Sequence, residues 1–178
     1  MEGLSQTKMS LVEVARRLDE SGIRWAVFAG AAAMAYGVDR PITDVDILVP
    51  SSEGERLAEL FPEGEIERDE RGEVDGLRLD GFDIIAGLRL VDLDEQMAAR
   101  LTQGQVDSVP VPLIPVEDNI ALKATWGRGP EQGKHDWQDV EGMIAAVDRL
   151  DWDYLRWRLE QFGPKERAAQ TLARLKSF

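Results

Sequence analysis

The sequence predicts an α+β fold in which a small β-sheet is flanked by helices and followed by a helical C-terminal region. Two observations predict it. Up to about residue 115, short apolar runs suited to strands alternate with helical patterns, whereas residues 116–178 show helical patterns alone. The chain has 178 residues, 43% of them hydrophobic, which is enough to bury one substantial core. We therefore expect one compact unit, with a sheet-containing part over residues 1–115 and a helical part over residues 116–178 packed on it.

The elements of the first part follow from local signals. Ser10 and Glu13 form a capping box, and the apolar stripe that follows predicts a helix ending at Gly22. Further helices are predicted from Ala31, over residues 54–60, and from Asp92 to about Gly104. Strands are predicted over residues 23–28, 44–49, 74–79, 82–86 and 109–114. Helices and strands thus alternate along the first part, as an α+β fold requires.

The second part carries two apolar stripes at helical spacing. The stripes are Val140, Met143, Ile144 and Val147, and then Trp152, Leu155, Leu159 and Phe162. The second stripe ends at Gly163 and Pro164, which stop a helix. We expect these helices to bury their stripes against the first part.

Composition excludes several kinds of site. The chain has no cysteine, so disulfides, thiol catalysis and thiolate metal sites are excluded. It shows neither an apolar run long enough to span a membrane nor a signal peptide, so we expect a soluble, cytoplasmic protein with no membrane partner. The net charge of −13 weighs against a broad DNA-binding surface, because binding to the phosphate backbone needs Lys and Arg.

The acidic excess is concentrated in residues 51–75, where ten acidic side chains accompany three arginines. We interpret this block as a solvated face. The alternative is that it attracts a cationic acceptor, such as an aminoglycoside-like molecule.

Two aspartates, Asp44 and Asp46, provide the chemical signal. Side chains alternate along a strand, so both carboxylates should point to one face. Their apolar neighbours predict a buried strand, and a buried strand does not normally carry two unpaired carboxylates. A cation should therefore lie there, and Mg²⁺ fits because it takes a few carboxylate oxygens and completes its shell with water and phosphate.

The residues around this pair follow a recognisable register. In chain order they are Gly30, Ala31, a spacer of twelve residues, Asp44, Val45, Asp46 and Ile47. The register resembles the signature of the polymerase-β-like nucleotidyltransferase superfamily. The spacer also contains Tyr36, Gly37, Arg40 and Thr43, a run similar to one branch of it, which includes abortive-infection toxin-type and antibiotic nucleotidyltransferases. The resemblance covers about residues 23–49 and implies a nucleotidyltransferase fold with a small mixed sheet.

The resemblance implies metal-assisted chemistry at phosphorus. Nucleotidyl transfer is an in-line displacement in which two metal ions stabilise the attacking and leaving oxygens. Asp44 and Asp46 would bind these ions, two Mg²⁺ or alternatively Mn²⁺. The backbone N–H groups of Gly30, Ala31 and Ala32 would face the triphosphate, helped by the positive end of the helix. The alternative for Gly30 is an ordinary strand-to-helix turn.

A third carboxylate is expected from a neighbouring strand, and Asp83 in the run GFDIIAG matches it. Its implied roles are to bind the catalytic metal and to act as base toward the acceptor hydroxyl. Asp75 and Asp80 are competitors, but each adjoins a glycine, as turn residues do. An ordinary strand-end aspartate is the alternative for Asp83.

The helix that begins near Val116 resembles the one in these enzymes from which a lysine reaches the triphosphate, and Lys123 would be that lysine. A surface lysine whose stem covers apolar neighbours is the alternative. Asp136 or Asp139 is expected to hold Lys123 or Arg128 in place, unless Asp136 only caps a helix. These two aspartates belong to the stretch KHDWQDV, which resembles a downstream motif.

One departure concerns the turn. Many members have a serine there whose hydroxyl contacts phosphate, but this sequence reads Gly30-Ala31-Ala32. Arg40 and Thr43 are the predicted substitutes, and their alternative is a structural turn with Pro41.

The loop before KHDWQDV contains three glycines and the only histidine, His135, which we interpret as solvated because no second histidine is present to share a metal. Such a loop is suited to closing over a nucleotide.

The sequence therefore predicts transfer of a nucleoside monophosphate from a nucleoside triphosphate to an acceptor hydroxyl. The acceptor is open between a small molecule, a tRNA end and a protein side chain. The alternative function is a catalytically silent nucleotide-binding or antitoxin-like protein with the same fold. A partner protein or a homodimer is compatible with the sequence.

Overall fold

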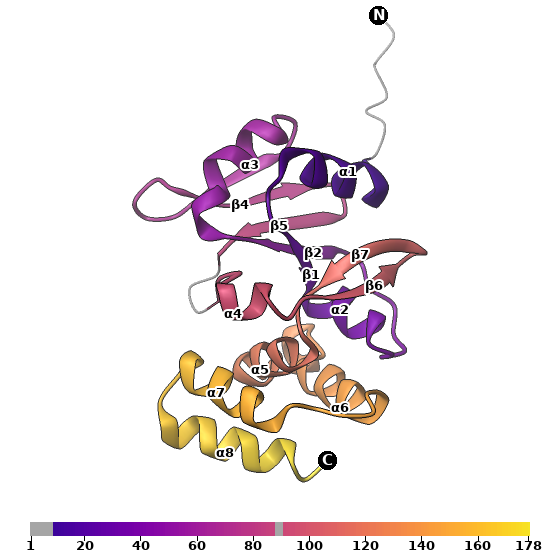
Figure 1. Cartoon of the computed structure of the whole chain (residues 1–178), viewed down its shortest axis with the longest axis vertical. Coiled ribbons are helices and arrows are strands. Elements are labelled where there is room, and N and C mark those ends of the chain that lie inside the picture. Colours follow the sequence, from indigo (N-terminus) through magenta and orange to yellow (C-terminus); the bar gives the residue numbers. More distant parts are fainter. Residues whose placement is uncertain (1–8, 88–90) are drawn as a thin grey trace, which may run out of the picture.

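The computed structural model describes residues 9–87 and 91–178, which form a seven-stranded sheet with helices on both faces (Figure 1). The strands are β1 (Ala26–Phe28), β2 (Val45–Val49), β3 (Glu65–Arg68), β4 (Val74–Leu79), β5 (Phe82–Ala86), β6 (Thr102–Val106) and β7 (Val109–Leu113). The α-helices are α1 (Leu11–Ser21), α2 (Ala29–Ala35), α3 (Gly54–Leu60), α4 (Glu95–Ala98), α5 (Val116–Trp126), α6 (Asp136–Ala146), α7 (Trp152–Phe162) and α8 (Lys165–Leu175). Two short 3₁₀ helices are η1 (Ser51–Glu53) and η2 (Pro130–Gln132).

The sheet is mixed, with the strand order β3-β4-β5-β2-β1-β7-β6. Strand β2 pairs in parallel with β5, and β1 pairs in parallel with β7, while the other neighbours are antiparallel. Within this register Asp46 lies opposite Asp83 on one side and opposite Phe28 on the other. The centre of the sheet thus brings Asp46 next to both the end of β1 and the start of β5.

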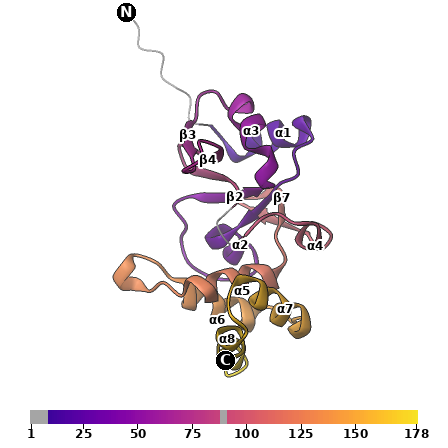
Figure 2. The ribbon, with the colours of Figure 1, turned by 90° about the vertical axis from the view of Figure 1, so that its left-hand side faces the viewer.

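The alternation of side chains along the central strands builds two cores. Phe28 and Leu48 belong to the core under α5, α6, α7 and α8, whereas Val27 and Ile47 belong to the core under α1 and α3. Figures 1 and 2 show these two groups of helices on opposite sides of the sheet. Because successive strand residues point to opposite faces, a single strand such as β2 supports both layers.

A buried ion pair ties the C-terminal helices to the sheet side. Arg158 on α7 contacts the carboxylate of Asp118 on α5, and its Nη1 donates to Asp94 at 2.6 Å. Asp94 is the N-cap of α4, where its side chain accepts the backbone N–H of Met97. The Arg158 and Asp118 side chains are buried, so removing either partner would leave an uncompensated charge in the core.

The expected α+β architecture is confirmed. Ser10 accepts a hydrogen bond from the Glu13 amide at 3.3 Å at the start of α1, and Gly22 adopts the left-handed conformation that ends it. Helix α5 begins at Val116, and helices α5 to α8 make up the region that follows. In the two described ranges no helix is long and apolar enough to cross a membrane.

The helix predicted from Asp92 to Gly104 is wrong. Helix α4 covers only Glu95–Ala98, and the residues after it form strand β6. Asp92 instead accepts hydrogen bonds from the amide and hydroxyl of Ser51. Strand β6 pairs with β7 across a two-residue turn at Asp107 and Ser108, both with positive φ, which is the geometry of a tight hairpin.

Three smaller corrections concern local sequence patterns. The strand β3 (Glu65–Arg68) was not predicted, because all four residues are exposed and lack an apolar alternation. Helix α2 begins at Ala29 and not at Ala31. The strand predicted over residues 23–28 is shorter, since β1 covers only Ala26–Phe28.

Candidate functional site

The three predicted carboxylates, Asp44, Asp46 and Asp83, line one cavity of about 180 Å³. Gly30 and four basic side chains line the same cavity. Asp46 lies on β2, and Asp83 is its partner on β5. Asp44 stands one residue before β2 and is exposed, so the prediction that both carboxylates lie on a buried strand is wrong for Asp44. The edge where β2 and β5 begin is therefore the acidic side of the cavity.

Asp46 is partly buried and lies beside the charge of Asp83. The pKa of Asp46 is raised to about 6, chiefly by burial and also by the charge of Asp83, while Lys123 and Lys134 act in the opposite direction. A carboxylate near like charges is stabilised by a nearby cation. Asp46 is thus held in a position where a bound cation would lower its free energy.

Asp83 has a cationic partner in this structure. Arg78 Nε donates to Asp83 Oδ1 at 3.1 Å, and Arg78 also pairs with Glu67. The pair is exposed, with 55% of the Arg78 side chain and 37% of the Asp83 side chain accessible, so its stabilisation is small. Of the competitors for the third position, Asp75 lines a different hollow and Asp80 lies in the turn between β4 and β5, so of these three residues only Asp83 lines the cavity of Asp46.

The turn between β1 and α2 is held in an unusual conformation. Ala29 has a φ of 55°, which non-glycine residues rarely adopt. The side chain of Asn119 on α5 accepts the Ala29 amide at 2.8 Å and donates to the Ala29 carbonyl at 3.1 Å. This buried amide therefore fixes the backbone from which the site is built. Asn119 was not predicted, although an amide inside the apolar stretch NIAL was a usable signal.

Gly30 lies directly under the guanidinium of Arg40. A Cβ atom built on Gly30 would come 3.0 Å from Nη2 of Arg40, so glycine leaves the space that Arg40 uses. Ala29 and Gly30 line the cavity, whereas Ala31 and Ala32 are fully buried and belong to the core under α1. Their side chains lie behind the turn and do not border the cavity.

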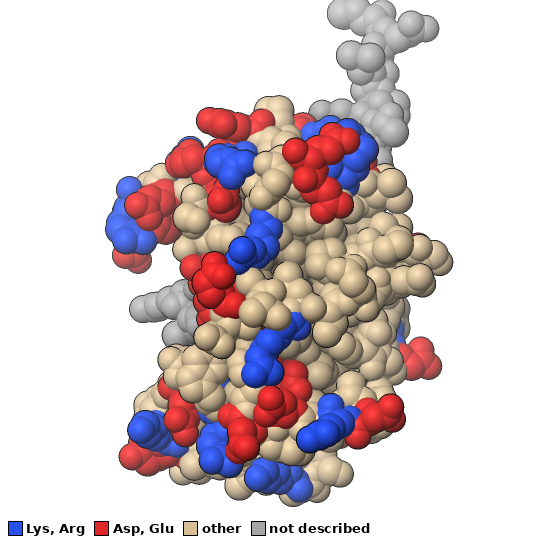
Figure 3. All heavy atoms as spheres, viewed as in Figure 1, with Lys and Arg blue, Asp and Glu red and all other residues tan. Residues whose placement is uncertain are grey.

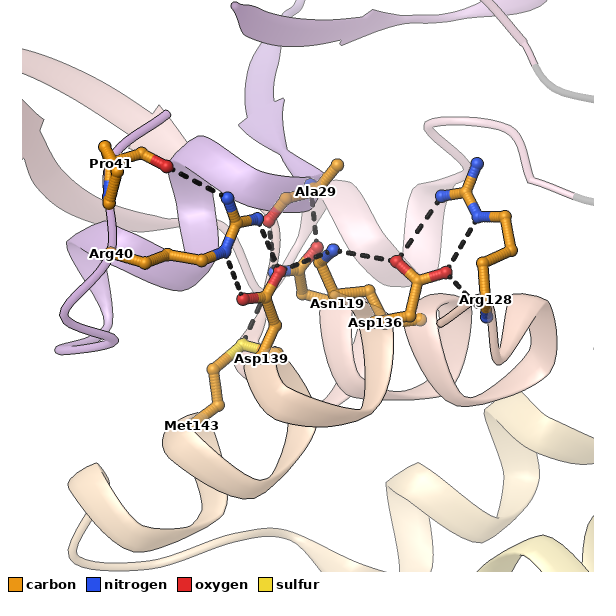
Figure 4. A network of polar contacts seen from close by, with 9 residues as sticks. Ala29, Arg40, Pro41, Asn119, Arg128, Asp136, Asp139 and Met143 are labelled. Carbon is orange, nitrogen blue, oxygen red and sulfur yellow. Dashed lines mark hydrogen bonds and ion pairs between the residues drawn. The ribbon is translucent and has the colours of Figure 1, made fainter. Parts of the chain in front are cut away.

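Five charged side chains form a connected network on the other side of the cavity (Figure 4). Arg40 donates from Nε and Nη2 to the two oxygens of Asp139 at 2.6 and 2.7 Å. Lys123 Nζ lies 2.8 Å from Asp139 Oδ2 and 3.1 Å from Asp136 Oδ1. Arg128 donates from Nε to Asp136 at 2.8 Å. Asp139 on α6 thus links the loop before β2 to α5. Asp136, also on α6, links α5 to the loop that follows it.

The network is largely buried. The side chain of Lys123 is 3% exposed, which rules out the alternative of a surface lysine. Burial raises the pKa of Asp139, but hydrogen bonds from Arg40 and Lys123 outweigh burial and hold that pKa below its ordinary value. The same balance, with Arg128 and Lys123 as donors, lowers the pKa of Asp136. Both carboxylates are therefore ionised at neutral pH, and the expectation that they hold Lys123 and Arg128 is confirmed.

The remaining predicted residues lie at the rim. The hydroxyl of Thr43 donates to Asp44 at 2.9 Å, so Thr43 orients a carboxylate in this structure. His135 is exposed on the loop before α6 and also lines the cavity. Arg128, Gly133 and Lys134 from the same loop complete that wall.

Among the residues that the structure describes, no three acidic or histidine side chains form a ready-made metal cage. Asp44, Asp46 and Asp83 therefore line one cavity without forming such a group.

The surface outside the cavity is charged but mixed. On the face drawn in Figure 3, basic and acidic side chains alternate and no broad basic patch is seen. Much of the acidic block at residues 51–75 is engaged in exposed ion pairs, such as Arg56 with Glu53 and Arg68 with Glu55. These contacts favour the interpretation of that block as a solvated face.

Comparison with known proteins places the fold. No protein-family model and no curated protein matches the sequence. An antigenic nucleotidyltransferase-like protein from Paracoccidioides brasiliensis matches with a TM-score of 0.54 and 17% identity, over 92% of this chain and 84% of that one. The lincosamide antibiotic adenylyltransferase LnuA, bound to lincomycin, matches with a TM-score of 0.54 and 10% identity, over 79% of this chain and 100% of the other. At these identities the likeness concerns the fold, and it confirms the nucleotidyltransferase fold that residues 23–49 implied.

Proposed function

We propose that this chain, whose fold is that of the nucleotidyltransferases, transfers a nucleoside monophosphate from a nucleoside triphosphate to an acceptor hydroxyl with the help of Mg²⁺. The observation that carries the proposal is the cavity that unites Asp44, Asp46 and Asp83 on one side with Arg40, Lys123 and Arg128 on the other. The carboxylates on one side could bind a metal cation, and the basic side chains on the other side could bind the phosphates of a nucleotide. A metal–triphosphate complex has both charges in one molecule and matches this arrangement.

The chain's own residues would divide the work. Asp83 would accept the proton of the acceptor hydroxyl as its oxygen attacks the α-phosphorus. Gly30 would leave the turn open to a phosphate, and the neighbouring Arg40 would replace the hydroxyl that the turn lacks. Lys123, held between Asp136 and Asp139, would donate to the triphosphate from a fixed position.

The ligands of the metal would be Asp44, Asp46 and Asp83. When bound there, Mg²⁺ would neutralise the triphosphate and stabilise the attacking and leaving oxygens. The raised pKa of Asp46 supports this assignment. Burial and the charge of Asp83 disfavour the ionised carboxylate, and a bound cation would stabilise it.

The test is a transfer assay with nucleoside triphosphates labelled at the α-phosphate. Acceptors from three classes are offered: aminoglycoside and lincosamide antibiotics, tRNA, and proteins of a cell extract. Label should appear on one class together with pyrophosphate, and only with Mg²⁺ or Mn²⁺ present. Metal-dependent nucleotide binding without transfer to any of them would favour the silent nucleotide-binding or antitoxin-like alternative.

Asp83→Asn is the decisive variant in that assay. It should lower turnover by roughly two orders of magnitude or more while triphosphate affinity stays within a few-fold, because Asp44 and Asp46 remain. Arg78→Gln is the matched control, since it removes the partner of Asp83 and leaves the carboxylate. If both variants lose activity equally, Asp83 acts through its ion pair and not as the base.

A further inference from the structure

Lys134 differs from every other basic side chain that lines the cavity. Arg40, Lys123 and Arg128 are each bound to Asp136 or Asp139. Lys134 lines the same cavity but forms no ion pair or side-chain hydrogen bond with any residue in the described ranges. A cation placed at the mouth without a partner is available to a ligand.

The backbone that carries Lys134 is fixed. The carbonyl of Gly129 accepts hydrogen bonds from the amides of Gln132 and Lys134, at 3.0 and 3.1 Å. Gly133 has a φ of 66°, a conformation that glycine adopts without cost, and it turns the chain toward the cavity just before Lys134. The Asp136 carboxylate accepts the Arg128 amide at 3.1 Å and closes the other end of the loop. Only the side chain of Lys134 therefore has to move to reach a ligand.

The charge balance of the network indicates the sign of that ligand. Arg40, Lys123 and Arg128 bring three positive charges against the two negative charges of Asp136 and Asp139, so one positive charge is in excess before Lys134 is counted. Arg128 is about one third exposed, and Lys134 is exposed on the same loop. Asp44, Asp46 and Asp83 on the opposite side of the cavity outweigh this excess, so the wall would attract an anion that arrives together with a cation bound to those carboxylates.

We propose that Lys134 binds the terminal phosphates of the nucleoside triphosphate and stays bound to them as pyrophosphate leaves. The inference rests on the proposed function and assigns a residue that the sequence did not single out. In the reaction, the acceptor oxygen forms a bond to the α-phosphorus while the bond from that phosphorus to the bridging oxygen breaks. The electron pair stays on pyrophosphate, and the acceptor's proton goes to Asp83. Lys134 meets the negative charge that grows on the leaving group.

The test compares three anions by calorimetry, using the full chain in the presence of Mg²⁺: ATP, inorganic pyrophosphate and AMP. Lys134→Gln should weaken binding of ATP and of pyrophosphate by about tenfold, or about 1.4 kcal/mol, and leave AMP binding unchanged. Lys134→Arg should restore most of the affinity. Lys165→Gln is the matched control, because Lys165 is an exposed lysine at the start of α8 outside the cavity.

The outcomes are separable. Equal pyrophosphate affinity in the wild type and in Lys134→Gln would overturn the role of Lys134 and leave the proposed function in place. A parallel loss of ATP, pyrophosphate and AMP binding with a lower Tm would also overturn it, because that result describes a structural residue. If the wild type binds neither ATP nor pyrophosphate, the proposed function fails and Lys134 with it.

Discussion

The two sides of the cavity differ in how their charges are balanced. The carboxylate wall consists of Asp44, Asp46 and Asp83 at one edge of the sheet, and burial, together with the charge of Asp83, raises the pKa of Asp46 there. The cation wall, which consists of Arg40, Lys123 and Arg128, is satisfied by two buried carboxylates of α6. A bound cation would therefore stabilise the first wall, whereas the second is already neutralised by its own ion pairs. Binding of a cation would relieve the electrostatic cost on the carboxylate wall. The ion pairs of the cation wall would hold its side chains in position for a ligand.

The largest expected effect removes the carboxylate wall. Asp44→Asn with Asp46→Asn should weaken Mg²⁺-dependent triphosphate binding by more than about 100-fold, since two of the three metal ligands lose their charge. Without metal, the Tm should stay level or rise because repulsion among the carboxylates is relieved. Calorimetry with and without Mg²⁺ checks the first point, and a thermal scan in chelator checks the second. Unchanged nucleotide affinity would refute the metal site.

Next in size is the loss of the centre of the cation wall. Asp139→Asn leaves the buried Lys123 and the partly buried Arg40 without their shared carboxylate, which should lower the free energy of unfolding by about 3 kcal/mol. Triphosphate affinity should fall by about tenfold, because both cations lose their position. Urea denaturation measures the stability, and Asp153→Asn is the control, since that side chain is 91% exposed. A stability loss below about 1 kcal/mol would mean that the network does not organise this wall.

The pH dependence of stability distinguishes the walls without any ligand. The folded-state pKa of Asp46 is raised to about 6 from an ordinary value of 3.8, so the folded protein binds more protons between these values. Stability contributed by Asp46 is then present at low pH and is lost as the pH rises through about 6. In chelator, Asp46→Asn should be more stable than the wild type by about 1 to 3 kcal/mol at pH 7.5 and equal to it near pH 4. A difference independent of pH would contradict the buried, repelled state of Asp46.

The smallest expected effect concerns Gly30, where the walls meet. Gly30→Ala should keep or slightly raise stability, because alanine favours the helical conformation of α2. Its Cβ would nonetheless press on Arg40 Nη2, so triphosphate affinity should fall by about three- to tenfold. Gly163→Ala is the control, with nothing within 4 Å of its new Cβ. Loss of stability together with affinity would indicate that Gly30 serves the turn alone.

Much of the fold could be predicted because its core elements carry strong periodic signals. The stripe of α1 and the apolar runs of β2, β5 and β7 gave correct elements, since these residues are buried against both layers. Strands β3 and β6 lie at the two edges of the sheet and are mostly exposed. Edge strands obtain their structure from pairing with a neighbour, which a local pattern does not record.

Part of the candidate site could also be predicted from the sequence. The resemblance located Asp44, Asp46, Asp83 and Lys123, all of which line one cavity, because spacing along strands and helices determines direction. Whether they bind metal and nucleotide stays a prediction. The contacts of Arg40 with Asp139 and of Asn119 with Ala29 were not predicted, since each joins segments about one hundred residues apart. Only the packing of α5 and α6 on the sheet brings these partners together.

The large sequence separation of these partners also determines the order in which the two walls form during synthesis. Arg40 and Asp139 are 99 residues apart in the chain, and contacts of such long range form slowly because a large loop must close first. During synthesis the three carboxylates emerge several seconds before the helix that fixes Arg40 and Lys123, given roughly 5–20 residues per second. A nascent chain would therefore hold the three carboxylates of the proposed metal site before the cation wall is assembled. Competence for the reaction would begin only when α6 docks, so the late helix acts as an internal check that folding is complete.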